Sequence, residues 1–113
     1  MNLFGLFGPP VPAVGPADAQ QLVSDGWSLL DVREPHEFRS ARISGARLVP
    51  LGRLGREAGD LAGKRWVVVC RSGNRSRAAA AALIGAGIEA RNLKGGMLAW
   101  QAARLPVVTG GRS

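Results

Sequence analysis

The fold class of this 113-residue chain is decided by the stretch Trp66-Val67-Val68-Val69-Cys70-Arg71-Ser72-Gly73-Asn74-Arg75-Ser76. Its first four residues form an unbroken apolar run rich in β-branched side chains, which is typical of a central strand covered on both faces. The alanine-rich segment 77–86 comes next and strongly favours a helix, which Gly87 ends. A buried strand that passes through a short loop into a helix indicates an α/β fold.

The segments on either side continue this alternation. Strands are predicted at 13–14, 28–32, 46–49 and 88–93, and helices at 16–24, 35–39, 51–61 and 97–103. A chain that alternates in this way builds a parallel sheet with helices on both faces. We expect one domain at 13–107, between a flexible N-terminal tail, 1–12, and a C-terminal tail, 108–113.

The composition excludes several function classes. The formal net charge of +7 comes mostly from arginines, which are scattered along the chain without interleaved aromatic residues, so a solvated surface is favoured over a nucleic-acid site. A single cysteine forms no internal disulfide, which argues against a small secreted, disulfide-stapled fold. One cysteine and one histidine are too few soft ligands for a metal cluster, and no nucleotide-binding glycine pattern appears, so no metal or cofactor is expected.

The apolar opening, Met1 to Gly8, is brief and is soon interrupted by prolines. It lacks the charged start and the long apolar core of a signal peptide, and no segment approaches the roughly 20 apolar residues of a membrane helix. We therefore expect a cytoplasmic protein without a membrane partner, either a monomer or a homodimer.

The strand-to-helix turn carries the chemistry. Cys70 stands at the carboxyl end of the predicted central strand, where open α/β sheets bind their ligands. The free N–H groups of a helix start, together with Arg71, Arg75 and Arg77, would lower the thiol pKa and hold an anion beside the sulfur. Gly73 lets the backbone bend. These features favour a nucleophile that works by two-step covalent catalysis, and the alternative is a buried, inert cysteine.

Four motifs in order resemble the rhodanese family of sulfurtransferases, from about Pro16 to Pro106. The four motifs are Leu30-Asp31-Val32-Arg33-Glu34-Pro35-His36-Glu37-Phe38, Ile43-Ser44-Gly45-Ala46 with Val49-Pro50, Cys70-Arg71-Ser72-Gly73-Asn74-Arg75-Ser76, and Gly95-Gly96-Met97-Leu98-Ala99-Trp100. The chain departs from the family at Ala41-Arg42, where Gly-His is frequent, and at Ser44, where proline is frequent. These positions lie outside the loop.

The resemblance implies a three-layer fold with a five-stranded parallel sheet, and a persulfide carried on Cys70. It makes a small anionic donor such as thiosulfate the expected first substrate, and cyanide or a thiol the second. It also assigns the substrate-binding pocket to the loop residues Arg71, Ser72, Gly73, Asn74, Arg75 and Ser76. Asp31 and Arg33 match a supporting family pair, which either orders loop amides or forms a plain structural ion pair.

The remaining motif residues are expected to be structural. His36 is interpreted as an exposed bystander, Trp100 as core, and Gly95 and Gly96 as turn residues.

Other function classes stay open beside this one. A cysteine phosphatase or arsenate reductase would carry arginine six positions after the cysteine, where Ser76 stands. A non-catalytic binding module and a persulfide relay between proteins are the remaining alternatives, and the relay uses the same chemistry at Cys70.

Overall fold

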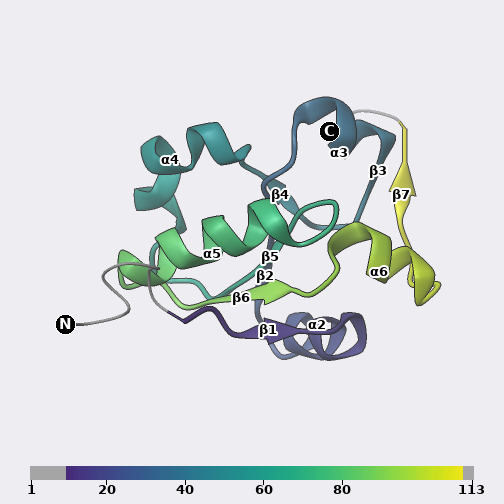
Figure 1. The fold of residues 1–113 in the computed structure, drawn as a ribbon, viewed down its shortest axis with the longest axis horizontal. Helices are drawn as coiled ribbons and strands as arrows, with labels where there is room; N and C mark the ends of the chain where they lie inside the picture. The colour runs from purple at the N-terminus through teal and green to yellow at the C-terminus, as the bar shows by residue number, and fades with distance from the viewer. Residues whose placement is uncertain (1–9, 111–113) are drawn as a thin grey trace.

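The computed structural model describes residues 10–110 of the chain. The elements, in chain order, are β1 (Ala13–Val14), α2 (Pro16–Ser24), β2 (Ser28–Asp31), α3 (Pro35–Ser40), β3 (Ala41–Arg42), β4 (Arg47–Leu48), the 3₁₀ turn η1 (Leu51–Arg53), α4 (Leu54–Leu61), β5 (Trp66–Val69), α5 (Asn74–Gly85), β6 (Ala90–Leu93), α6 (Gly96–Ala102) and β7 (Val108–Thr109). Strands and helices alternate over most of this length (Figure 1).

The main sheet has five parallel strands in the order β1-β6-β5-β2-β4. The central strand is β5, which pairs with β2 on one side and β6 on the other, with Val68 opposite Leu30 and Asn92. All four residues of β5 are buried, as expected for a strand covered on both faces. The predicted α/β fold with a parallel five-stranded sheet is confirmed.

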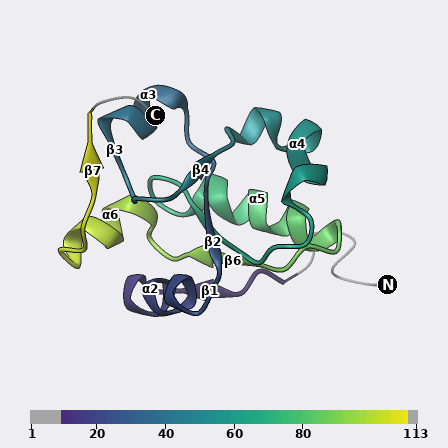
Figure 2. The same cartoon turned by 180° about the vertical axis from the view of Figure 1, so that it is seen from behind.

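Two apolar clusters lie on opposite faces of this sheet. Val68 and Cys70 point into a cluster that α4 and α5 complete through residues such as Leu61 and Leu83. Val67 and Val69, alternating with them, point into the cluster formed with α2 and α6. Figures 1 and 2 show α4 and α5 on one side of the sheet and α2 on the other, so the fold has three layers.

The helix after the central strand begins earlier than predicted. Its first residue is Asn74 rather than Arg77, because Gly73 adopts a left-handed conformation (φ 105°) at the N-cap and turns the chain directly into the helix. The loop is therefore shorter than the motif, and Arg75 and Ser76 lie in the first turn of α5.

The structure also has a two-stranded antiparallel sheet that the sequence did not predict. In it β3 pairs with β7, with Ala41 opposite Thr109 and Arg42 opposite Val108. Arg42 also donates a hydrogen bond to the Gly110 carbonyl (2.9 Å). Regular structure thus extends into 108–113, which the sequence assigned to a C-terminal tail, because distant segments pair there.

The predicted N-terminal tail, 1–12, lies mostly outside the described residues. Within them, the Pro12 carbonyl accepts a hydrogen bond from the Asn92 N–H (2.8 Å), which ties the chain before β1 to β6. Across residues 10–110, every helix is too short or too polar to cross a lipid bilayer.

Candidate functional site

Cys70 directly follows the central strand and begins the turn that leads into α5 (Figure 1). The residue is buried, with 1% of its surface exposed, and its thiol is free. A buried inert cysteine would be surrounded by apolar atoms, whereas this sulfur has polar donors directed at it. The Gly73 N–H donates to Sγ at 3.0 Å, and the Ser76 hydroxyl lies 3.3 Å from Sγ.

These donors change the acidity of the thiol. Burial raises the pKa of Cys70. Hydrogen bonds from the Ser76 hydroxyl and from the backbone N–H groups of Ser76, Gly73 and Ser72 lower it by more, so the pKa lies below its ordinary value of 9.0. The turn therefore favours the thiolate, which is the nucleophilic form.

The predicted loop residues differ in their burial and in their contact with Cys70 Sγ. Gly73 and Ser76 are buried beside the sulfur, whereas Arg71, Ser72 and Asn74 are exposed. The structure thus brings only part of the predicted pocket wall into contact with Sγ.

The two loop arginines have different surroundings. Arg75 is held by both oxygens of the Glu37 carboxylate from α3, at 2.6 and 2.9 Å. This pair keeps the pKa of Glu37 at about 2, mainly through the hydrogen bond from Arg75. Arg71, in contrast, is exposed and makes no ion pair or side-chain hydrogen bond with the residues that the structure describes. Arg71 is therefore the loop guanidinium that is available to an anion.

Asp31 and Arg33 form a buried ion pair at the end of β2. The Asp31 carboxylate accepts from Nε and Nη2 of Arg33, with the shortest distance 2.7 Å. Arg33 also donates to the backbone carbonyls of Ala41 (2.7 Å) and Glu37 (3.3 Å). The pair thus anchors α3 and β3 to the sheet, and the only hydrogen bonds to the Asp31 carboxylate from described residues come from Arg33.

The start of α6 is hydrogen-bonded to the turn that carries Cys70. The N–H groups of Met97 and Leu98 donate to the carbonyls of Cys70 (2.8 Å) and Arg71 (3.1 Å). Gly96 (φ 57°) packs so closely that a Cβ there would lie 2.6 Å from the Arg71 carbonyl oxygen. The glycine pair, interpreted as a turn, therefore also brings Gly96 into close backbone contact with the turn that carries Cys70.

The sequence did not predict that Glu37, Gly96 and Asn92 contribute to the site, although Glu37 lies in the first motif and Gly96 was interpreted as a turn residue. Asn92 is 7% exposed on β6, accepts from the Ser76 hydroxyl at 2.6 Å and donates to the Gly73 carbonyl at 3.1 Å. Asn92 shares the strand face of Ile88 and Ala90, and a polar residue on this otherwise apolar face was the available signal for it. Glu37 gave no comparable signal, since its partner lies 38 residues away.

A cavity of about 230 Å³ adjoins the turn. Its lining residues are Arg33, Glu37, Ser40, Ala41, Arg71, Met97, Leu98 and Gln101. Arg71, which has no carboxylate partner within residues 10–110, gives this cavity a positive wall, and Met97 and Leu98 give it an apolar one.

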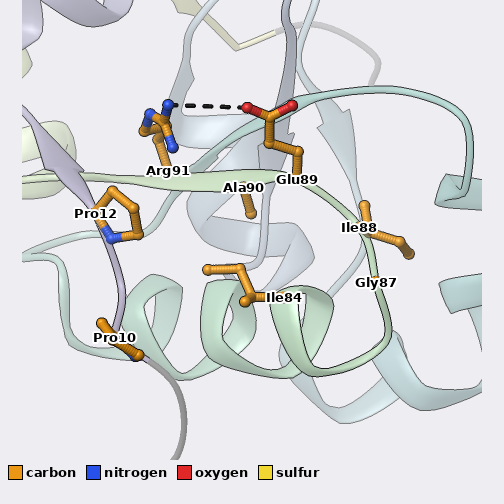
Figure 3. A pocket seen from close by; sticks show the side chains of 8 residues that line it. All are labelled: Pro10, Pro12, Ile84, Gly87, Ile88, Glu89, Ala90 and Arg91. Carbon is orange, nitrogen blue, oxygen red and sulfur yellow. Dashed lines mark ion pairs between the residues drawn. The ribbon is translucent and has the colours of Figure 1, made fainter.

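A second hollow, of about 350 Å³, lies at the opposite end of the sheet, where β6 begins (Figure 3). Prolines 10 and 12 and Ile84 line it, and the ion pair between Arg91 and Glu89 (3.8 Å) borders it. No thiol, hydroxyl or imidazole is among its lining residues, so it offers no nucleophile. Within residues 10–110, no three His, Cys, Asp or Glu side chains gather in a way that would hold a metal ion.

Comparison with known proteins gives a consistent result. The model of the rhodanese-like domain family matches residues 15–103. The chain is 37% identical over 92 residues to the thiosulfate sulfurtransferase GlpE of Ectopseudomonas mendocina, covering 79% of this chain and 84% of that protein. A crystal structure of a rhodanese-related protein from Thermoplasma volcanium superposes with a TM-score of 0.81 at 31% identity, covering 86% of this chain and 97% of that one.

An uncharacterized protein of Synechocystis is 43% identical over 98 residues, which is 84% of this chain. The chain spans 55% of the length of that relative.

Proposed function

The chain belongs to the rhodanese-like domain family, and from this premise we propose that it is a sulfurtransferase that carries sulfur as a persulfide on Cys70. The observation that carries the proposal is the placement of two hydrogen-bond donors, the Gly73 N–H and the Ser76 hydroxyl, on Sγ at the carboxyl end of β5. This arrangement supports a thiolate in a position where parallel sheets bind ligands.

In the first step the Cys70 thiolate attacks the outer sulfur of thiosulfate. A bond forms between Sγ and that sulfur, the S–S bond of thiosulfate breaks, and its electron pair leaves with sulfite. The product is a persulfide whose negative charge lies on the outer sulfur. In the second step cyanide or a thiolate attacks this outer sulfur, takes it as thiocyanate or a new persulfide, and restores the Cys70 thiolate.

Arg71 is assigned the recognition of the anionic donor. It is the loop arginine without a carboxylate partner among the described residues, and its planar donor set matches a sulfonate-type group. Arg75 serves indirectly, because its guanidinium is bound to Glu37.

The burial of Cys70 decides which sulfur atom the second substrate, the sulfur acceptor, can attack. With 1% of the residue exposed, Sγ itself is nearly enclosed, whereas the outer sulfur of a persulfide stands about 2.05 Å further along the chain of atoms. The acceptor therefore reacts at the outer sulfur. We propose small anions and thiols as substrates, and a persulfide relay to a partner protein uses the same outer sulfur.

The test is thiocyanate formation from thiosulfate and cyanide. We expect parallel lines in double-reciprocal plots, which indicate two-step transfer through a covalent intermediate, and complete loss of activity in Cys70→Ser. Turnover by Cys70→Ser at the rate of the parent chain would overturn the proposal. Slow turnover of thiosulfate beside fast persulfide exchange with a protein would identify the relay instead.

A further inference from the structure

The hydroxyl of Ser76 has one proton and two acceptors within reach. The oxygen of the Asn92 side-chain amide lies at 2.6 Å and the Cys70 sulfur at 3.3 Å. Ser76 is 0% exposed, and Cys70 and Asn92, which carry the two acceptors, are also buried, so bulk solvent does not compete with either acceptor. A hydroxyl donates one hydrogen bond at a time, and therefore the two acceptors compete for the same proton.

The orientation of Asn92 is determined by its second contact. Its Nδ2 donates to the Gly73 carbonyl at 3.1 Å. A flipped amide would place two carbonyl oxygens face to face at this point, and would direct N–H groups at a hydroxyl whose proton is then free for the sulfur. Only the observed orientation satisfies both ends of the amide, so Oδ1 faces Ser76.

We propose that Asn92 is a positioning residue of the sulfur-transfer reaction, which holds the Ser76 proton whenever Sγ is uncharged and releases it to Sγ when the thiolate forms. The inference deepens the proposed function and rests on it, because it assigns a role to Asn92 in the cycle of Cys70. Asn92 touches neither Sγ nor any substrate in this account and acts through Ser76 and Gly73.

The cycle follows from the charge on Sγ. In the thiol state the S–H group faces Ser76 Oγ, and the hydroxyl proton points to Asn92. In the thiolate state the proton turns to the charged sulfur, since a hydrogen bond to a charged acceptor is the stronger one. In the persulfide state the charge lies on the outer sulfur, Sγ becomes a weak acceptor, and the proton returns to Asn92. Asn92 thus favours the thiol and the persulfide states over the bare thiolate.

The charged groups around the turn do not replace this contact. Arg75 is the cation whose charge is felt by Cys70, and it is paired with Glu37 from α3. Asp31 and Arg33 pair with each other at the end of β2, and Arg71 is exposed. β6 itself contributes the uncharged Asn92 toward the turn, and α6 has no titratable side chain.

The test is a double-mutant cycle read out as the acid dissociation constant of Cys70. This constant is measured from the thiolate absorbance and the alkylation rate as functions of pH. In the parent chain, Ser76→Ala removes the hydroxyl bond that stabilises the thiolate and also the bond to Asn92 that stabilises the thiol state. The two losses partly cancel, so we expect the acid dissociation constant to fall only about threefold. In Asn92→Ala the hydroxyl has no competitor, and Ser76→Ala then lowers the constant about tenfold or more.

The bond from Asn92 to Gly73 is absent on both sides of the second comparison and cancels. Arg91→Ala, a neighbouring substitution on β6, is the matched control and leaves the effect of Ser76→Ala at its parent value. An effect of Ser76→Ala that is equal or smaller in the Asn92→Ala background would overturn the proposal. If Asn92→Ala does not fold, the same comparison is made in Asn92→Leu, which keeps the branched shape of the side chain without its hydrogen-bonding groups.

A second measurement needs no change at Asn92. The side-chain amide resonances of Asn92 should shift with the same midpoint as Cys70 ionisation in the parent chain, and the shift should largely disappear in Ser76→Ala. An equal shift in both proteins would mean that the charge alone moves the signal, which overturns the proposal. Neither measurement uses a sulfur donor, so a failure of the proposed function would be seen in the transfer assay and not here.

Discussion

The two ends of the parallel sheet differ in what they bury. Among residues 10–110, the buried polar or charged side chains are Asp31, Arg33, Ser76 and Asn92, and all four lie toward the carboxyl end of the strands, where Cys70 sits. At the opposite end, where β5 begins, the buried side chains are apolar, and the Trp66 indole N–H donates to the Leu61 carbonyl (2.8 Å).

This difference has a physical meaning. Burying polar groups is costly unless each has a hydrogen-bond partner, and the described part of the chain leaves no buried side-chain nitrogen or oxygen without one. The polar groups at the Cys70 end satisfy one another: Asp31 with Arg33, and Ser76 with Asn92. The apolar end stabilises the fold by burying hydrocarbon surface, and the polar end holds in place the groups that surround the Cys70 sulfur.

The largest expected effect is a loss of folding stability, and it is measured by one substitution at each end of the sheet. Asp31→Ala leaves the Arg33 guanidinium buried without its carboxylate and should reduce the free energy of unfolding by about 3–5 kcal/mol. Leu61→Ala removes buried apolar volume at the other end and should cost about 2–5 kcal/mol while the pKa of Cys70 stays as it is. Urea unfolding measures both. A loss below about 1 kcal/mol for Asp31→Ala would mean that the pair is not a structural anchor.

The next largest effect concerns recognition of the anionic sulfur donor rather than the stability of the fold. Arg71→Ala should lower kcat/KM for thiosulfate about tenfold to a hundredfold, the usual consequence of losing a charged hydrogen bond to a substrate. Arg56→Ala, which removes an exposed arginine from α4, is the matched control and should leave kcat/KM unchanged. Equal losses in the two variants would indicate a general effect of positive charge and remove Arg71 from the site.

The smallest effect is the contribution of the ion pair between Glu37 and Arg75. The pKa of Glu37 is lowered from its usual 4.5 to about 2, so the pair stabilises the folded chain fully above pH 4.5, and the stabilisation is lost as the pH falls from 4.5 toward 2. Because both side chains are partly exposed to solvent, Glu37→Gln should cost only about 1 kcal/mol at pH 7.

Unfolding experiments at several pH values check this contribution. The difference between Glu37→Gln and the parent chain should shrink below pH 4.5. A difference that is constant down to pH 2 would mean that the carboxylate does not titrate as described.

Local patterns are sufficient to predict the central strand and the glycine-containing turn that holds Cys70. The run Trp66–Val69, the glycine at 73 and the alanine-rich segment after it carry strong propensities within a few residues of one another. The start of α5 was misplaced by three residues, because a left-handed Gly73 at the N-cap is a property of backbone geometry rather than of composition.

The features that were missed depend on contacts between distant segments. The pairing of β3 with β7 joins positions about 67 residues apart, and neither strand has a distinctive pattern alone. The same holds for Glu37, which takes the guanidinium of Arg75, and for Asn92, whose role depends on a helix start 16 residues away. The sequence predicts the same role for Arg71 and Arg75, and only their surroundings in the fold distinguish them.

Transfer of a sulfur atom to Cys70 can be read from the intact mass of the protein after incubation with thiosulfate. We expect a gain of about 32 Da that cyanide or dithiothreitol removes and that Cys70→Ser does not acquire. An unchanged mass in the parent chain, or the same gain in Cys70→Ser, would contradict it.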